Sequence, residues 1–304
     1  MNLRVGKLWG GLALAALLSF NTTATTFYVD VNSTNPVAPY SDWSMAATNI
    51  QDAIDAATDG DLVLVTNGVY ATGGRVVYGS LTNRVVINKA ITVQSINGPD
   101  VTTIQGNSAN SRLSDLIANW VRCVYLTNSA VLKGFKLLSG GSSSGGGGGA
   151  WCESTSSLLI NCSVTSNTII YAGYGSGVYS GTLSNCTLFA NYNPISSGSA
   201  YASILHNCII MGNYGANTSG GGGAANCMLD RCLIASNSIG TYAQGGGVYE
   251  ASLTNCILLG NIGGNFSKGG GASQSQLNNC LIVSNTANLG GGAYNCLLNN
   301  CTII

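Results

Sequence analysis

The sequence predicts an all-β solenoid, in which short parallel strands of successive coils stack along one axis. From residue 140 onward an Asn-Cys pair recurs, with Arg-Cys in one copy, and its cysteines are 24, 22, 24, 24, 24 and 21 residues apart. Only 7% of the 304 residues are charged and 42 are glycine, whereas an ordinary soluble protein has roughly 25% charged residues. A repeat of this length cannot bury a core alone, so its copies must stack.

The composition excludes several other classes of protein. Eleven Lys and Arg balance eleven Asp and Glu, so the chain carries no net charge. Nucleic acids and anionic membranes bind clustered basic residues, and we therefore expect neither as a partner. The 45% content of hydrophobic residues is too high for a disordered chain.

Residues 1–24 have the pattern of a secretory signal peptide. Arg4 and Lys7 precede an apolar run from Leu12 to Phe20, and Thr22-Thr23-Ala24 follows as a small-residue cleavage site. The run is too short to cross a bilayer, and no second apolar run is long enough to do so. We therefore expect an exported chain without a transmembrane segment, secreted to the exterior or placed at the outer cell surface.

Residues 25–139 are predicted to form an N-terminal cap and the first coils. A short helix is expected over residues 49–57, with Thr48 as its N-cap and Gln51 at the capping-box position. Its apolar stripe consists of Ile50, Ala53, Ile54 and Ala57. Short β-branched runs between turn residues predict strands over Leu62–Val65, Val85–Ile87, Ile91–Val93, Cys123–Leu126 and Val131–Leu138.

Residues 140–304 are predicted to form repeat coils of 21–24 residues, and the whole chain after the signal peptide is predicted to form about seven to nine coils. The unit reads GG-G-[VA]-Y-x-x-x-L-x-N-C-x-[IL]-x-x-N. The Asn-Cys cysteines are Cys162, Cys186, Cys208, Cys232, Cys256, Cys280 and Cys301. Asparagine recurs five residues later at Asn167, Asn191, Asn213, Asn237, Asn261 and Asn285. One leucine column consists of Leu183, Leu205, Leu229, Leu253, Leu277 and Leu298.

The residue before each cysteine is expected to lie at a bend. Leu and Cys both face inward although they are three residues apart, so the chain must turn between them. Asn fits that turn because it tolerates the left-handed conformation. Stacked side chains of this Asn column would form an asparagine ladder, and at Arg231 we expect a looser or differently hydrogen-bonded bend.

These motifs resemble the pectin-lyase-like superfamily. The stretches Asn49-Ile50-Gln51-Asp52-Ala53-Ile54 and Gly60-Asp61-Leu62-Val63-Leu64-Val65 look like its capping helix and first strand, and the resemblance covers about residues 45–304. It implies a right-handed parallel β-helix. The repeats look closest to the non-enzymatic polymorphic outer-membrane proteins, and because one fold hosts many functions, the motifs identify the fold better than the activity.

The cysteines allow three interpretations: disulfides, metal ligands or buried apolar thiols. Stacked positions are ~4.8 Å apart, within disulfide range, but eleven cysteines is an odd number. A metal needs thiolates that converge at one point, whereas a column runs along a line. We favour buried thiols, expect no metal or cofactor, and leave Cys227 with Cys232 and Cys296 with Cys301 open as local pairs.

No catalytic residue is assigned from the sequence. His206 and Asp230 are weak candidates, since they are expected on adjacent coils of one outward column and such a pair can orient a general base. A second outward column offers candidate ligand-binding residues, because flat aromatic rings stack on sugars. It consists of Tyr179, Tyr201, Tyr249 and Tyr294; the alternative is that these rings stack on one another and stiffen the solenoid.

The predicted function is that of an exported, non-catalytic surface or extracellular protein of a bacterium, adhesin-like or glycan-contacting. Its partner would be extracellular polysaccharide or a host or neighbouring cell surface. The alternatives are a structural spacer and a polysaccharide lyase or glycoside hydrolase. An enzyme would have its site on the first coils, among Arg75, Arg84, Arg112, Asp115, Arg122, Lys133 and Lys136. Because Thr302-Ile303-Ile304 falls inside a strand, we also expect a longer natural chain.

Overall fold

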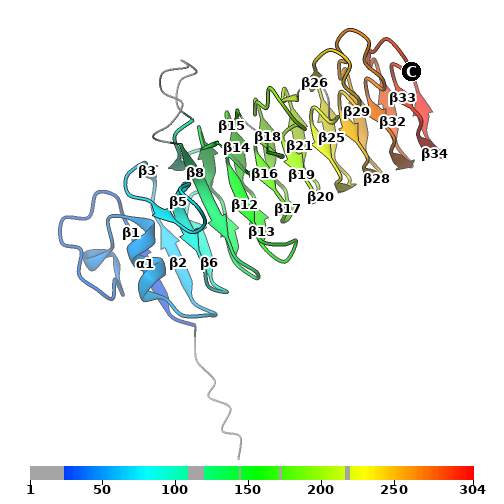
Figure 1. The fold of residues 1–304 in the computed structure, drawn as a ribbon. Coiled ribbons are helices and arrows are strands. Elements are labelled where there is room, and N and C mark those ends of the chain that lie inside the picture. Colours follow the sequence, from blue (N-terminus) through cyan, green and yellow to red (C-terminus); the bar gives the residue numbers. More distant parts are fainter. Residues whose placement is uncertain (1–23, 109–119, 144, 171–172, 216–219) are drawn as a thin grey trace, which may run out of the picture.

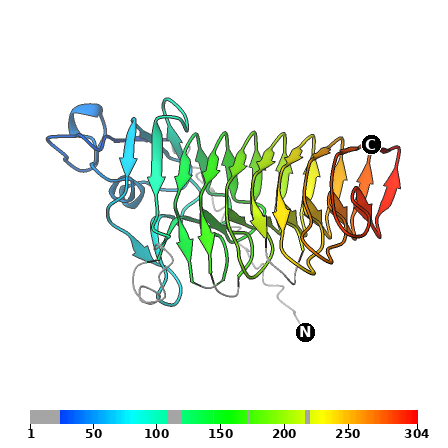
Figure 2. The same cartoon turned by 90° about the horizontal axis from the view of Figure 1, so that it is seen from above.

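The computed structural model describes residues 24–108, 120–143, 145–170, 173–215 and 220–304. In these residues the chain winds into an all-β parallel solenoid whose coils follow one another along the axis in sequence order (Figure 1). This confirms the predicted fold class. Seen from above, the strands of successive coils stand side by side (Figure 2). No helix in the described ranges is long and apolar enough to cross a membrane.

Three long sheets, here named A, B and C, form the sides of the solenoid, and within the described residues only the β4–β5 pair among their named strands is antiparallel. Sheet A contains β1 (Thr26–Val29), β2 (Leu62–Val65), β6 (Thr92–Ser95), β9 (Val131–Lys133), β13 (Leu158–Ile160), β17 (Thr182–Ser184), β20 (Ile204–His206), β24 (Met228–Asp230), β28 (Ser252–Thr254), β31 (Gln276–Asn278) and β34 (Leu297–Asn299).

Sheet B contains β3 (Gly68–Tyr70), β7 (Thr102–Gln105), β10 (Lys136–Leu138), β14 (Ser163–Thr165), β18 (Thr187–Phe189), β21 (Ile209–Met211), β25 (Leu233–Ala235), β29 (Ile257–Leu259), β32 (Leu281–Val283) and β35 (Thr302–Ile303). Sheet C contains β4 (Arg75–Val76), β5 (Thr82–Ile87), β8 (Val121–Leu126), β12 (Ala150–Cys152), β16 (Val178–Tyr179), β19 (Ala200–Tyr201), β23 (Ala224–Ala225), β27 (Val248–Tyr249), β30 (Ala272–Ser273) and β33 (Ala293–Tyr294). Two short pairs join β11 (Gly141–Ser142) to β15 (Thr168–Ile169) and β22 (Tyr214–Gly215) to β26 (Ser238–Ile239).

The residues of each column found in the sequence pair with one another in register in these sheets. In sheet A, Leu183 pairs with Leu205 and Leu205 with Leu229, so the leucines stack inward and are buried. The Asn-Cys cysteines from Cys162 to Cys280 are also buried in the same core. The predicted strand over Val131–Leu138 is divided into β9 and β10, because Gly134 bends the chain with a φ of +76°.

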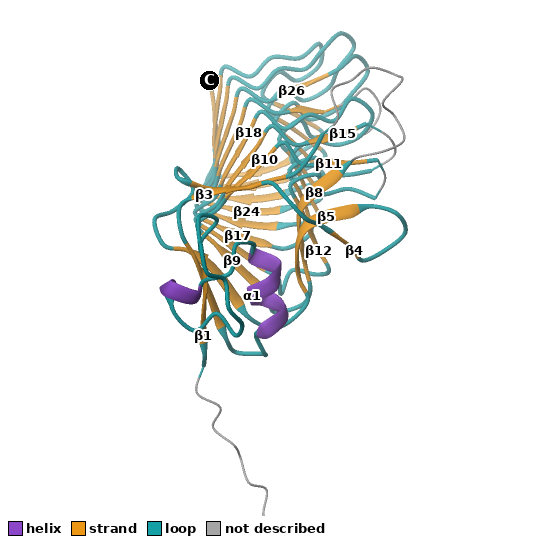
Figure 3. Ribbon diagram, turned by 90° about the vertical axis from the view of Figure 1, so that its left-hand side faces the viewer, coloured by secondary structure: helices purple, strands orange, loops and turns teal. Residues whose placement is uncertain are grey.

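A short helix covers the N-terminal end of the stack (Figure 3). Helix α1 (Ile50–Ala56) follows the single-turn helix η1 (Trp43–Met45), and its predicted apolar stripe is buried. The predicted N-cap, Thr48, is wrong: Asn49 caps the helix, since its side chain reaches the amide of Asp52 at 2.9 Å. Gln51 instead exchanges two hydrogen bonds with the backbone of Val86 and fastens the helix to β5.

The predicted bend before each cysteine is present. Asn161, Asn185 and Asn207 have φ values of 52–54°, in the left-handed region. Arg231 has the same φ, 52°, so its bend is not looser than the others. The amide of Arg231 donates to Thr254 at 3.0 Å, in the same way that each of its neighbours bonds to the next coil.

The asparagine ladder lies in a different column from the one predicted. Side chains at the bend are mostly exposed, because a corner residue between two inward-facing residues must point outward. The buried ladder consists of the second asparagine column. There Asn237 accepts from the backbone N and the Nδ2 of Asn213 at 3.1 and 2.9 Å, and donates to Ile210 O at 2.8 Å and Asn261 Oδ1 at 3.0 Å.

Glycine beside the ladder lets the coils approach closely. A Cβ atom added at Gly223 would lie 2.7 Å from the carbonyl oxygen of Gly247, and one added at Gly247 would lie 2.5 Å from that of Gly271. The same added atoms would lie within about 3.1 Å of the ladder amides of Asn237 and Asn261. Only glycine leaves room for both the backbone and the ladder.

Replacing one buried asparagine should destabilise the solenoid. In Asn237→Ala, hydrogen-bonding groups of Asn213, Ile210 and Asn261 lose their partner, and we expect the free energy of unfolding to fall by at least about 2 kcal/mol. Urea unfolding measures this loss. The matched control is Asn185→Gly at an exposed bend, which should change stability by less than about 0.5 kcal/mol. Equal losses in the two variants would contradict a role for the ladder.

Candidate functional site

The four predicted tyrosines lie in one column on the outer side of sheet C. Tyr179 pairs in register with Tyr201, and the column continues through Ala225, Tyr249, Ser273 and Tyr294. The side chains are partly buried. Burial, followed by a hydrogen bond with Glu250, raises the pKa of the Tyr249 hydroxyl to about 12, so it remains a neutral donor.

The aromatic column begins two coils earlier than the sequence analysis placed it. Trp151 stacks on Tyr179 with ring centroids 5.9 Å apart, and Tyr125 stacks on Trp151 at 5.0 Å. Tyr201 stacks on Tyr179 at 5.8 Å and on Tyr174 at 4.4 Å. These stacked rings cover one another's faces, so they offer edges and hydroxyls to a ligand. Of the interpretations offered, mutual stacking therefore accounts for this part of the column.

A pocket of about 550 Å³ lies at the N-terminal end of the aromatic column, beside Tyr125 and Trp151. Tyr78 is 67% exposed, and its ring lies 6.0 Å from that of Tyr125 and 6.4 Å from that of Trp151. Glu153 is exposed and accepts a 2.6 Å hydrogen bond from Tyr125 Oη. The lining also includes Val77, Gly79, Leu81, Asn83, Arg122 and Gly145.

Arg122 forms part of the framework of this pocket. Its side chain is buried, with Nη1 donating to Asn83 Oδ1 at 2.7 Å, Nε to Gly147 O at 2.7 Å and Nη2 to Gly146 O at 2.8 Å. Burial lowers the pKa of Arg122 to about 10, so the guanidinium remains charged at neutral pH. Since these donors already have partners, Arg122 is not arranged as a free anion-binding group.

Four residues of this pocket were not among the predicted site residues: Tyr78, Tyr125, Trp151 and Glu153. One signal was present: Gly148-Gly149-Ala150-Trp151 fits the start of the repeat unit, with Trp in the tyrosine position. Tyr78 had no such signal, because it precedes the repeats and approaches the column only through the β4–β5 hairpin.

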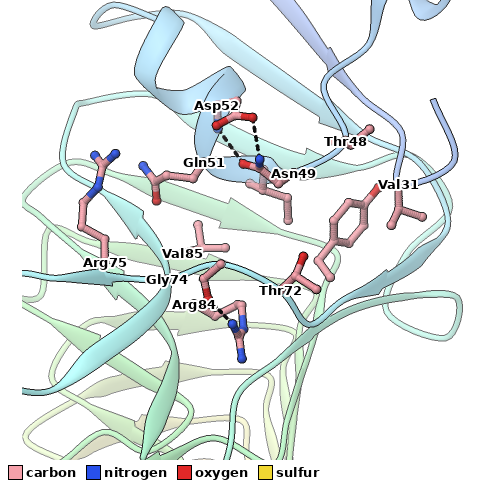
Figure 4. A pocket seen from close by; sticks show the side chains of 13 residues that line it. Val31, Thr48, Asn49, Gln51, Asp52, Thr72, Gly74, Arg75, Arg84 and Val85 are labelled. Atoms are coloured by element: carbon pink, nitrogen blue, oxygen red, sulfur yellow. Dashed lines mark hydrogen bonds between the residues drawn. The ribbon is translucent and has the colours of Figure 1, made fainter. Parts of the chain in front are cut away.

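A second, smaller pocket of about 230 Å³ lies beside the capping helix (Figure 4). Asp52, Arg75 and Arg84 all line it. The pocket thus combines a carboxylate with basic side chains, as the enzyme alternative would need. Each has a structural partner, however. Asp52 accepts from Asn49 Nδ2, Arg75 forms a bidentate pair with Asp55 at 2.9 and 2.6 Å, and Arg84 donates to the carbonyl oxygens of Gly73 and Gln105.

The other residues named for an enzyme site do not join this pocket. Lys133 is in β9 of sheet A and Lys136 in β10 of sheet B, while Arg122 is in β8 of sheet C. Arg112 and Asp115 lie outside the described residues. The described members of this set are therefore divided among different sides of the solenoid.

His206 and Asp230 are neighbours in register on the outer side of sheet A, as predicted. His206 Nδ1 lies 3.7 Å from Asp230 Oδ2, but the same oxygen pairs with Arg231 Nη2 at 2.9 Å. Ser184 pairs in register with His206 on its other side. The carboxylate is thus engaged more closely by Arg231 than by the imidazole.

All eleven cysteines are free thiols in the structure, including the two pairs left open, Cys227 with Cys232 and Cys296 with Cys301. Within the column, the amide of Cys162 donates to Cys186 Sγ at 3.4 Å, and that thiol donates to Leu159 O at 3.3 Å. Among the residues the structure describes, no three His, Cys, Asp or Glu side chains are grouped as a metal ion requires.

Replacing Arg122 by a neutral residue should destabilise the folded protein. Arg122→Met leaves the oxygens of Asn83, Gly146 and Gly147 without a donor, and we expect the free energy of unfolding to fall by at least about 3 kcal/mol. Thermal and urea unfolding measure this effect. Lys133→Met, on an exposed position of β9, is the control and should cost less than about 0.5 kcal/mol. An unchanged stability in Arg122→Met would contradict the structural role.

The three buried thiols outside the Asn-Cys column should resist alkylation. Burial raises the pKa of Cys123, Cys152 and Cys227 to about 12, so at pH 8 only about one thiol in ten thousand is ionised. Iodoacetamide should label the partly exposed Cys296 and Cys301 first, and labelling of the three buried thiols should require unfolding. Peptide mass spectrometry reads the order, and rapid labelling of Cys152 in the folded protein would contradict it.

No family model and no curated protein sequence matches this chain. Solved structures do match. Pectate lyase Pel9A aligns with a TM-score of 0.55 at 15% identity, over 93% of this chain and 79% of its own. A rhamnogalacturonan lyase gives 0.41 at 14% identity over 86% and 68%, and pectin methylesterase PemA from Erwinia chrysanthemi gives 0.43 at 10% over 81% and 81%. The alignment with Pel9A agrees with the strand order described above: the chain has the parallel β-solenoid fold of this pectate lyase.

Proposed function

We propose that this chain is an exported, non-catalytic β-helix protein that binds extracellular polysaccharide on the outer side of sheet C. The pocket between Tyr78, Trp151 and Glu153 carries the proposal. Its volume of about 550 Å³ lies within the range of small-molecule sites, which suits one or two sugar units of a longer chain. The signal-peptide pattern in residues 1–24 supports export.

The pocket combines the two kinds of group that sugars need. The ring of Tyr78 is largely exposed and can pack against the apolar C–H face of a pyranose. The carboxylate of Glu153 is exposed and can accept hydrogen bonds from hydroxyl groups. The Tyr78 ring lies 6.4 Å from that of Trp151, too close for a sugar to enter between them, so a sugar ring would pack against Tyr78 with its hydroxyls towards Glu153.

The charge of the pocket favours a neutral polysaccharide over an acidic one. Among its described lining residues, Glu153 is the carboxylate and Arg122 the cation. The guanidinium of Arg122 is buried and already donates to three protein oxygens. A uronate would therefore meet the carboxylate of Glu153 without a free positive group to offset the repulsion.

Substitution of Tyr78 tests the proposal. Tyr78→Ala should weaken retention on a neutral polysaccharide by at least about 10-fold, since an aromatic–sugar contact is worth on the order of 1.5 kcal/mol. Tyr242→Ala is the matched control, because Tyr242 is 68% exposed on a remote loop and should not affect binding. Affinity electrophoresis in gels containing xylan, mannan, β-glucan or polygalacturonate measures the retention.

Three outcomes would contradict the proposal. Equal weakening by Tyr78→Ala and Tyr242→Ala would show that the pocket is not the binding site. Stronger retention by polygalacturonate than by every neutral polysaccharide would contradict the charge argument. Release of unsaturated uronate or of new reducing ends, lost in Arg84→Met, would favour the lyase or hydrolase alternative at the pocket of the capping helix.

A further inference from the structure

The outer side of sheet B is apolar over five successive coils. Its two outward-facing columns are in register from β18 to β32. In the two coils that directly precede this segment, strands β10 and β14 carry polar outward-facing residues such as Lys136 and Thr165. The columns then become apolar, with Phe189, Ile209, Met211, Leu233, Ala235, Ile257, Leu259, Leu281 and Val283.

This face is large enough to be the centre of an interface. Six of its side chains are each 36–43% exposed: Phe189, Ile209, Met211, Ile257, Leu259 and Leu281. At about 200 Å² for a large side chain, they expose on the order of 500 Å². The largest apolar patch of a monomer is about 300–600 Å² and is often functional, and a standard interface buries about 800 Å² on each partner. The flanking Thr187, Leu233 and Val283 supply further area.

The borders of this face permit a flat surface to approach it. The bend that follows each strand of sheet B from β18 to β32 is occupied by a small residue: Ala190, Gly212, Ser236, Gly260 and Ser284. Two sheets pack face to face at about 10 Å, which a bulky border residue would prevent. The strands from β14 to β35 of this sheet carry no charged residue, so a charged partner would gain nothing here.

We propose that this face is the interface of a homodimer, formed by sheet B of two copies of the chain. A second copy offers an apolar surface of the same length without charged residues, and two such faces meet without like-charge repulsion. The six side chains supply more than half of the roughly 800 Å² that a standard interface buries on each partner, and Thr187, Leu233 and Val283 add to it. Because sheet C is a different side of the solenoid, this assembly leaves the aromatic pocket open.

Analytical ultracentrifugation of the chain from Thr25 tests the proposal. We expect a dimer that persists in about 1 M salt, since the contact contains no charges. Ile257→Glu would bury a carboxylate at the centre of the face, and we expect the dimer to dissociate at least about 30-fold more readily. Met228→Glu is the matched control: Met228 is 60% exposed on sheet A, and its variant should remain dimeric.

Other results would overturn the proposal. A chain that stays monomeric at about 100 μM, a concentration well above the dissociation constant of a stable dimer, contradicts it. So does a dimer that Met228→Glu breaks and Ile257→Glu does not. A monomer that binds phosphatidylcholine vesicles through Ile257 would assign this face to a lipid surface instead. Circular dichroism of both variants ensures that dissociation is not unfolding.

Discussion

The side-chain amides of the buried asparagine column keep the coils of this solenoid in register. Within the column they accept from the coil before and donate to the coil after, as Asn237 does between Asn213 and Asn261. An amide buried in a core is costly unless its donors and acceptors are all used. Because the pattern closes only when each coil has its asparagine at the same height, a shift of register would leave several groups unsatisfied at once.

The outer surfaces of sheets B and C both depend on that register. A strand with one inward side chain sends its neighbours outward, so a residue type that recurs in the repeat becomes a continuous column. On sheet C this produces the stacked rings from Tyr125 to Tyr201, and on sheet B it produces the apolar face around Ile257. The interior is filled by side chains such as Leu229 and Cys232, so both the proposed polysaccharide site and the proposed dimer interface lie on these outer sides.

The repeats allowed much of the fold to be predicted, whereas the candidate site could be predicted only in part. The constant spacing between the leucine and cysteine columns is compatible with only one packing arrangement, in which both face the core. The choice between Thr48 and Asn49 as N-cap, by contrast, depends on which side chain reaches the amide of Asp52. Two asparagine columns look alike in sequence, and only burial separates them. The pocket escaped prediction because Tyr78 reaches Trp151 through a hairpin outside the repeats.

In the coils from Tyr179 onward, differences in length are accommodated in the connection between sheets B and C. Leucine, cysteine and ladder asparagine keep constant spacings, whereas the chain from Asn191 to Ala200 is shorter than that from Asn167 to Val178. The differences in length among these coils therefore fall between sheets B and C, where the stacked rings of Tyr242 and Phe266 also lie. Peptides grafted into this connection in successive coils would be displayed one coil apart. The solenoid could therefore hold an array of binding groups at a fixed spacing.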